Sequence, residues 1–321
     1  MTLVHTIIIG ILQGVSELFP VSSLGHAVLI PSILRWGIDQ KSESWLAFLV
    51  ALHVGTAIAL LIYFRDDWVS VVKAFVRSVQ QGQMGSDHDE RLAWMVVLGT
   101  IPTGVVGLVL QAPLRSLFAS PYAAACFLIV NGAIMFVGER FLQRQLAERA
   151  EASTADAMAY RQQAAGGAGF VPSSSTNMTG GSASRDDPEI GRYRDITQLS
   201  WRDAAIIGLA QIGALLPGIS RSGVTMVAGL MAGLTHEASA RYTFLLATPI
   251  IGAAAALELP KLFDSGGRSI LGYAVLGMVL AGIAAYFSVR YLMRYFESGR
   301  LYPFAYYCVG AGVLGLILLA V

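Results

Sequence analysis

Charged residues are scarce in this chain. Asp, Glu, Lys and Arg make up 13% of its 321 residues, whereas a soluble domain carries about 25%. Hydrophobic residues account for 55%, and the mean hydropathy is +0.60. This composition excludes a water-soluble fold and makes the lipid bilayer the main solvent of the chain.

Strong charge of either sign and clustered cysteines are lacking too. The formal net charge is only +1, so no nucleic-acid partner is expected. Cys126 and Cys308 are isolated within apolar runs, without the spacing of a metal site or the density of a disulfide framework. Both are expected to be small core residues.

Long apolar runs dominate the sequence instead. A helix needs about 20 apolar residues to cross the hydrocarbon core of a bilayer. Six stretches meet this requirement and are predicted to be transmembrane helices: residues 45–64, 92–110, 122–141, 238–257, 270–291 and 302–321. The predicted fold class is therefore an all-α polytopic membrane protein.

Two further apolar stretches, residues 3–34 and 201–234, are broken near their middles by Pro20 and Pro217. Proline removes a backbone donor, and opened backbone cannot face lipid unless protein or a water-filled cavity satisfies it. We predict two re-entrant helical hairpins whose breaks line a cavity. The alternative for each is one kinked spanning helix.

The two breaks match each other at a separation of 197 residues, with Pro20 over Pro217 and Ser23 over Ser220. This predicts an inverted-topology repeat, residues 1–147 and 198–321, each half a re-entrant hairpin plus three transmembrane helices. Three spans invert the second half, so the hairpins can meet near the midplane. Residues 148–197, rich in Ser, Gly, Ala, Arg and Asp, are expected to form a flexible cytoplasmic insert.

Basic residues are distributed unequally between the two faces of this arrangement. One face carries eleven, the other five. The first set is Arg65, Lys73, Arg77, Arg91, Arg140, Arg144, Arg149, Arg241, Arg290, Arg294 and Arg300; the second is Arg35, Lys41, Arg115, Lys261 and Arg268. The positive-inside rule makes the first face cytoplasmic, which places both termini outside.

Polar residues gather in the first hairpin, where Gln13, Glu17, Ser22, Ser23 and His26 surround the break. Gln13 and Glu17 are four apart, so a helix places both on one face, able to share a cation or a water. A carboxylate in a membrane segment is costly and indicates function. His26, three residues after Ser23, is interpreted as catalytic rather than as a packing residue.

The second hairpin contains the run Pro-Gly-Ile-Ser-Arg-Ser-Gly-Val-Thr at residues 217–225. Free N–H groups at a helix start attract an anion, and the guanidinium of Arg221 can grip phosphate oxygens bidentately. This predicts a phosphate-binding tip. The predicted substrate-binding residues are Ser22, Gly25, Gly218, Ser220, Ser222, Gly223 and Thr225.

Structural alternatives exist for some of these residues. Glu17 and Arg221 could form a buried ion pair without a catalytic role. Thr225 could instead cap or bond its own helix. His53, within an apolar span, is interpreted as structural.

The two motifs together resemble those of the bacterial undecaprenyl-pyrophosphate phosphatases of the bacitracin-resistance type. The family patterns are Glu/Gln-x-x-x-Glu followed by Pro-Val-Ser-Ser-x-Gly-His, and Pro-Gly-x-Ser-Arg-Ser-Gly-x-Thr. They stand here as residues 13–26 and 217–225. The resemblance covers nearly the whole chain apart from the insert and extends to residues 237–246.

The resemblance implies hydrolysis of undecaprenyl pyrophosphate to the monophosphate in the bacterial cytoplasmic (inner) membrane. It also implies recycling of the lipid carrier for cell-wall synthesis and bacitracin resistance. Glu17 and Gln13 are the predicted ligands of a divalent cation, Mg²⁺ or Ca²⁺, and Gln13 leaves that site one charge short of a glutamate pair. A homodimer is compatible with the apolar faces.

For the chemistry we predict catalytic roles for Glu17, Ser23, His26 and Arg221. Ser23 is the predicted nucleophile and His26 its proton partner, while attack by water or by His26 itself stays open. The competing functions are an inverted-repeat transporter or flippase for a polyprenyl phosphate and a non-catalytic membrane scaffold. Phosphate release would separate the hydrolase from the transporter.

Overall fold

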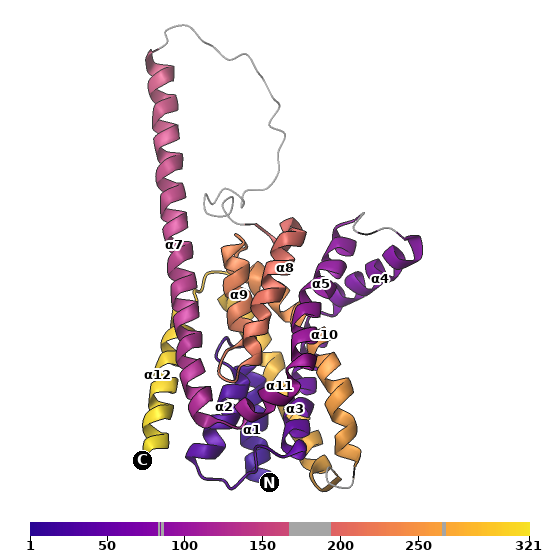
Figure 1. Cartoon of the computed structure of the whole chain (residues 1–321). Coiled ribbons are helices and arrows are strands. Elements are labelled where there is room, and N and C mark those ends of the chain that lie inside the picture. Colours follow the sequence, from indigo (N-terminus) through magenta and orange to yellow (C-terminus); the bar gives the residue numbers. More distant parts are fainter. Residues whose placement is uncertain (83, 85–86, 167–193, 265–267) are drawn as a thin grey trace. The chain divides into compact units, whose positions relative to one another are not determined.

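The computed structural model describes residues 1–82, 84, 87–166, 194–264 and 268–321. In this part of the chain the secondary structure is helical, apart from one isolated bridge between Arg194 and Leu234 (Figure 1). Contacts divide the chain into two units. The first comprises Met1–Glu139 and Arg194–Val321, and the second comprises Arg140–Tyr193.

Six helices in the described residues are long and apolar enough to cross a membrane. Each overlaps one of the six stretches expected from the sequence. They are α3 (Glu43–Tyr63), α5 (His88–Val109), the Pro121–Glu148 part of α7 (Pro121–Gly166), α10 (His236–Glu258), α11 (Leu271–Tyr295) and α12 (Tyr302–Ala320).

The two remaining apolar stretches are broken helices, as their prolines predict. The first contains α1 (Leu3–Ser16) and α2 (Ser23–Ile33), and the second contains α8 (Trp201–Ala210), the 3-10 turn η3 (Gln211–Leu215) and α9 (Arg221–Met231). At about 1.5 Å per residue, none of these helices is long enough to span a bilayer.

The broken helices approach each other from opposite ends of the first unit. In Figure 1, α1 and α2 lie at the end that carries both chain termini, and α8 and α9 enter from the other end. We call the end with Met1 and Val321 the terminal end. A serine caps each of the two inner helices: Ser22 Oγ accepts from Gly25 N, and Ser220 Oγ accepts from Gly223 N. The chain breaks therefore lie in the interior of the unit.

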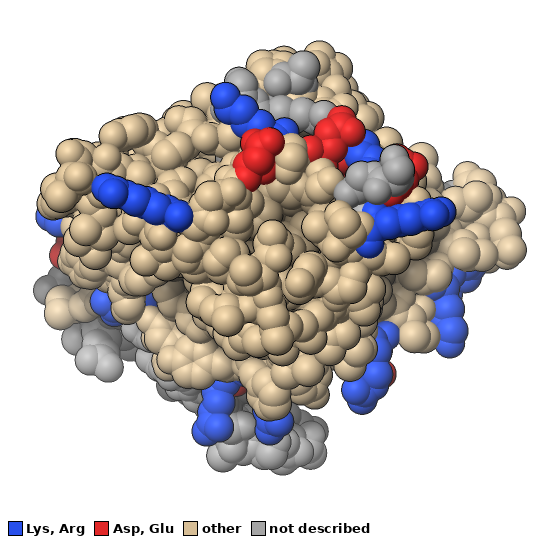
Figure 2. Space-filling view, turned by 90° about the horizontal axis from the view of Figure 1, so that it is seen from below, with Lys and Arg blue, Asp and Glu red and all other residues tan. Residues whose placement is uncertain are grey.

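Charged residues are few at the terminal end. Figure 2 views the molecule from that side, and residues other than Lys, Arg, Asp and Glu cover most of the surface. The acidic side chains that are visible gather near one margin. A face with few charged residues is expected at one end of a bundle of apolar helices.

The region expected to be a flexible insert differs from the prediction at its start. Residues 148–166 continue α7 as helix. They are rich in Ala, Glu, Arg and Gln, which are strong helix formers, and this propensity outweighs the low hydrophobicity on which the loop prediction depended. Residues 167–193 of the predicted insert lie outside the described residues.

Glycines allow α3 to pack closely on α11. A Cβ placed on Gly55 would lie 2.0 Å from the backbone oxygen of Met278, which no side-chain movement can relieve. On α12, by contrast, a Cβ on Gly310 would meet no atom within 4 Å. The α3–α11 contact therefore depends on the missing side chain at residue 55.

Replacing Gly55 by valine should destabilise the protein, because forcing extra atoms into a packed interior typically costs about 1–3 kcal/mol. We expect the midpoint of thermal unfolding in detergent to fall by several degrees, whereas Gly310→Val, the same change on an open helix face, should leave it unchanged. Equal midpoints for both variants would show that α3 and α11 do not pack in this way.

Candidate functional site

The tips of the two broken helices touch each other. Ser222 Oγ lies 3.3 Å from the carbonyl oxygen of Phe19 and 3.4 Å from that of Glu17. A Cβ on Gly25 would lie 3.0 Å from the Cα of Gly218, which itself has a φ of +103°. This φ requires glycine at residue 218. The absence of a side chain at Gly25 and Gly218 lets the two backbones approach closely.

Asn131, on α7, links both tips. Its Nδ2 donates to the carbonyl oxygen of Pro20 at 3.0 Å, and its Oδ1 accepts from the backbone N–H of Ser220 at 3.0 Å. The side chain is fully buried. One amide thereby satisfies backbone groups that the two chain breaks leave open. Sequence analysis missed this residue, although an asparagine in the middle of an apolar span was a usable signal.

Changing Asn131 to leucine should loosen both tips. The carbonyl of Pro20 and the N–H of Ser220 would each be left buried without this partner, at a cost of about 1–3 kcal/mol per group. We expect a lower unfolding midpoint together with a lower turnover of the site described below. Asn131→Asp keeps the acceptor and loses the donor, so its effect should be intermediate. A leucine variant with wild-type stability and turnover would contradict this role.

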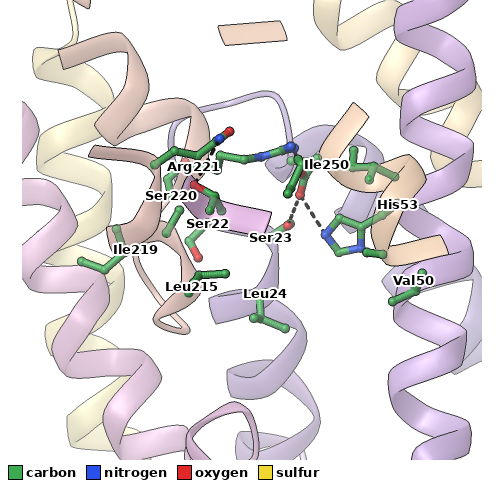
Figure 3. Close-up of a pocket in the computed structure, with 16 residues that line it drawn as sticks. Ser22, Ser23, Leu24, Val50, His53, Leu215, Ile219, Ser220, Arg221 and Ile250 are labelled. Atoms are coloured by element: carbon green, nitrogen blue, oxygen red, sulfur yellow. Dashed lines mark hydrogen bonds and ion pairs between the residues drawn. The ribbon is translucent and has the colours of Figure 1, made fainter. Parts of the chain in front are cut away.

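Glu17 makes four side-chain contacts, and three of its partners, Ser23, His53 and Arg221, are labelled in Figure 3. Arg221 forms an ion pair with it, and Ser23 Oγ donates a hydrogen bond to Oε2. Gln13 Nε2 donates to the same oxygen at 3.2 Å, and His53 Nε2 lies 3.1 Å from it. The exposed fraction of the Glu17 side chain is 7%. The carboxylate thus links both tips with α3.

Arg221 is held by two acceptors. Besides Glu17, it donates from Nη1 to the backbone oxygen of Ala247, on α10, at 3.1 Å. The residue is the first of α9, where Ser220 caps the helix and shares a 2.9 Å hydrogen bond with Ser222. The guanidinium and the hydroxyl groups therefore stand at a helix start, which favours anions.

A cavity of about 240 Å³ opens between these groups. Its polar lining residues are Glu17, Ser22, Ser23, His53, Thr103, Gln211, Ser220 and Arg221. The remaining lining is apolar and includes Leu215 and Ile250. The cavity can accept an anionic head group beside an apolar chain.

The structure brings together some predicted site residues and leaves others at a distance. Among the predicted substrate-binding residues, Ser22 and Ser220 line the cavity. Thr225 donates to the backbone oxygen of Arg221 at 2.6 Å, which is the helix-bonding alternative. Gly25, Gly218 and Gly223 are buried where the tips pack. Their contacts position the cavity wall.

His26 is directed to a different neighbour. Its Nδ1 lies 2.7 Å from the carbonyl oxygen of Ser22, and its Nε2 lies 2.8 Å from the hydroxyl of Tyr307, on α12. The two rings also stack, with centroids 5.6 Å apart. Because a carbonyl only accepts, Nδ1 carries the proton. His26 is not among the residues that line the cavity, so its catalytic role stays a prediction.

His53 lies in the cavity wall, and sequence analysis missed it. Its Nδ1 donates to the carbonyl oxygen of Leu49 at 2.8 Å, which turns Nε2 toward Glu17. The signal was available, since an ionisable side chain within a membrane span indicates function by default. The interpretation of His53 as a structural residue overlooked this rule.

The predicted cation ligands lie side by side. Gln13 Oε1 is buried and has no hydrogen-bond partner, and the Glu17 carboxylate is adjacent. Among the described residues, no three of His, Cys, Asp and Glu lie close enough to hold a metal by themselves. Mg²⁺ is usually held by one or two carboxylates together with phosphate oxygens. Glu17 supplies one such carboxylate at the cavity, whereas Gln13 is not among the residues that line it, and the cation stays a prediction.

Comparison with known proteins agrees with this geometry. A protein family described as bacitracin resistance protein BacA matches residues 6–314. The chain belongs to this family. An undecaprenyl-diphosphatase 2 of Frankia alni is 44% identical over 98% of the chain and 97% of its own length. An undecaprenyl-diphosphatase of Mycolicibacterium paratuberculosis is 43% identical over 99% and 97%. An undecaprenyl-diphosphatase 2 of Burkholderia ambifaria is 45% identical over 98% and 96%.

The matched residues 6–314 of the BacA family include both chain breaks and every residue of the polar cavity wall. Family membership and site geometry therefore concern the same part of the chain.

Proposed function

We propose that this protein is an undecaprenyl-diphosphatase, which hydrolyses undecaprenyl pyrophosphate to undecaprenyl phosphate and inorganic phosphate. The observation that carries the proposal is the full-length similarity to proteins of that name. The product would re-enter cell-wall synthesis as lipid carrier. The description of the matching family as bacitracin resistance protein supports a role in bacitracin resistance as well.

The placement of Arg221 supports a binding mode for the pyrophosphate. The guanidinium, the Ser220 hydroxyl and the start of α9 would hold the terminal phosphate by charge and by hydrogen bonds. A divalent cation bound to Glu17 and Gln13 Oε1 would neutralise phosphate charge. Phosphoryl transfer depends mostly on positioning and charge neutralisation, and these groups can provide both.

In the proposed reaction, Ser23 Oγ attacks the terminal phosphorus. An Oγ–P bond forms, the bond to the undecaprenyl phosphate oxygen breaks, and the Ser23 proton passes to Glu17, which already accepts its hydrogen bond. Glu17 passes this proton to the phosphate oxygen of the leaving lipid. Water then attacks the phosphorus of the phosphoserine, the Oγ–P bond breaks as a proton from the water passes through Glu17 to Ser23 Oγ, and inorganic phosphate leaves. Glu17 is the proposed proton acceptor because it contacts Ser23, and the role of His26 as proton partner stays a prediction.

We infer in addition that the two halves are inverted repeats in the bacterial cytoplasmic membrane. The entry of α1–α2 and of α8–α9 from opposite ends supports this inference (Figure 1). The smaller number of basic residues near the terminal end supports an outward orientation of that end, and thus of both termini.

Complementation in cells tests the function. Expression of the chain in a bacterium depleted of its own undecaprenyl-pyrophosphate phosphatases should restore growth and raise bacitracin tolerance. Glu17→Ala, produced at the same membrane level, should restore neither. Growth rescue by both forms would show that the site does not perform the essential reaction.

A further inference from the structure

A second cavity, of about 270 Å³, adjoins the catalytic one. Helices α3, α5 and α10 supply most of its lining. Five residues line both cavities, namely Val50, Thr103, Leu215, Ile250 and Ala254. The two cavities therefore adjoin at these five residues, next to the phosphate-binding groups.

The second cavity runs along α5 and α10 toward the terminal end. Beyond the shared residues its lining is Leu46, Gly104, Gly107, Leu108, Ala253 and Leu257. We call this apolar part the lateral passage. Polar groups return at its far end, where Gln111 Nε2 donates to Glu258 at 3.2 Å and Lys261 Nζ lies 2.8 Å from the other Glu258 oxygen. The chemistry thus changes from polar to apolar and back to polar.

Two glycines on α5 keep the lateral passage open. A Cβ on Gly104 would have Ile250 Cδ1 at 3.9 Å as its nearest neighbour, and one on Gly107 would have Leu215 Cδ2 at 3.6 Å. Both are ordinary contact distances. Close helix packing therefore does not explain these glycines, in contrast to Gly55, and the space beside them is not filled by protein.

We propose that the lateral passage binds the first isoprene units of the lipid pyrophosphate and is the route by which the lipid enters the site between α5 and α10. This inference rests on the proposed function. A head group held at Arg221 carries a covalently attached hydrocarbon chain, which must leave the polar cavity through an apolar exit. The lateral passage provides such an exit, and its leucines bury the chain's methylene and methyl groups.

Filling the lateral passage tests this assignment. The probes are undecaprenyl pyrophosphate and inorganic pyrophosphate, used with the full chain in detergent. Gly107→Leu should lower kcat/KM for undecaprenyl pyrophosphate about tenfold or more, chiefly by raising KM, since several methylene contacts of about fourfold each are lost. The inhibition constant of inorganic pyrophosphate, which carries no isoprene unit, should change less than twofold. Gly107→Ala should have a smaller effect in the same direction.

Gly252→Leu is the matched control. Gly252 lies on α10 facing outward, with no atom within 4 Å of an added Cβ, so both constants should stay at wild-type values. Unchanged kcat/KM for the long lipid in Gly107→Leu would overturn the proposal, as would an equal loss for both probes, which would indicate distortion of the phosphate site. Absence of phosphate release by the wild-type protein would contradict the proposed function instead.

Discussion

Arg221→Lys should lower phosphate release from undecaprenyl pyrophosphate by a factor of about 100 to 1,000. Arg221 reaches Glu17 with Nη2 and the Ala247 carbonyl with Nη1, so its planar fork is fixed at the cavity. A lysine keeps the charge but is a flexible point donor without the paired geometry that suits phosphate. The comparison therefore tests geometry rather than net charge.

Arg294→Lys is a suitable control for this prediction. Arg294 is exposed in the last turn of α11, and the same substitution there should leave phosphate release unchanged. Unfolding midpoints should accompany both measurements, because breaking a buried ion pair can cost about 3–5 kcal/mol. Near-normal turnover by a folded Arg221→Lys protein would mean that Arg221 serves only as an ion-pair partner of Glu17.

Ser23→Ala should lower turnover about a thousandfold or more, since it removes the atom proposed to attack phosphorus. Ser23 Oγ is directed at Glu17 and lines the cavity, so the substitution also removes the proton path between them. KM should change little, because the binding groups on α9 remain in place. Rapid-quench analysis with labelled substrate should detect a phosphorylated wild-type protein and no labelled Ser23→Ala protein.

Ser32→Ala provides the comparison on the same helix. Ser32 Oγ donates to the carbonyl of Val28 at 2.9 Å, outside the catalytic cavity, and its loss should affect turnover less than twofold. If Ser23→Ala retained turnover within about tenfold of the wild type, direct attack by water would replace the serine mechanism.

The helical class and the positions of the spans follow from the sequence because bilayer thickness fixes the length of an apolar helix. The breaks were predictable for a similar reason. Pro20 and Pro217 interrupt runs that are otherwise apolar. The serine hydroxyl groups beside them are polar and are not expected to face lipid. The helical extension of α7 beyond residue 148 could not be read from hydropathy, because it depends on helix propensity in a polar segment.

The part of the site formed by the two sequence motifs was predictable, because a motif consists of residues that are close together in the chain. Glu17, Ser23 and Arg221 lie within the two motifs and meet in the structure. His53 and Asn131 come from distant helices, and only the packing of α3 and α7 brings them to the tips. Tyr307 likewise engages His26 across 281 residues of sequence, which no local pattern indicates.

The most direct test of the account is the release of inorganic phosphate by the purified protein acting on undecaprenyl pyrophosphate, with and without a divalent-cation chelator. We predict release that requires the cation and that falls at least about a hundredfold in Glu17→Ala. Undecaprenyl phosphate should appear in equal amount. A folded protein that released no phosphate while still moving the lipid between leaflets would contradict the hydrolase and establish a transporter in its place.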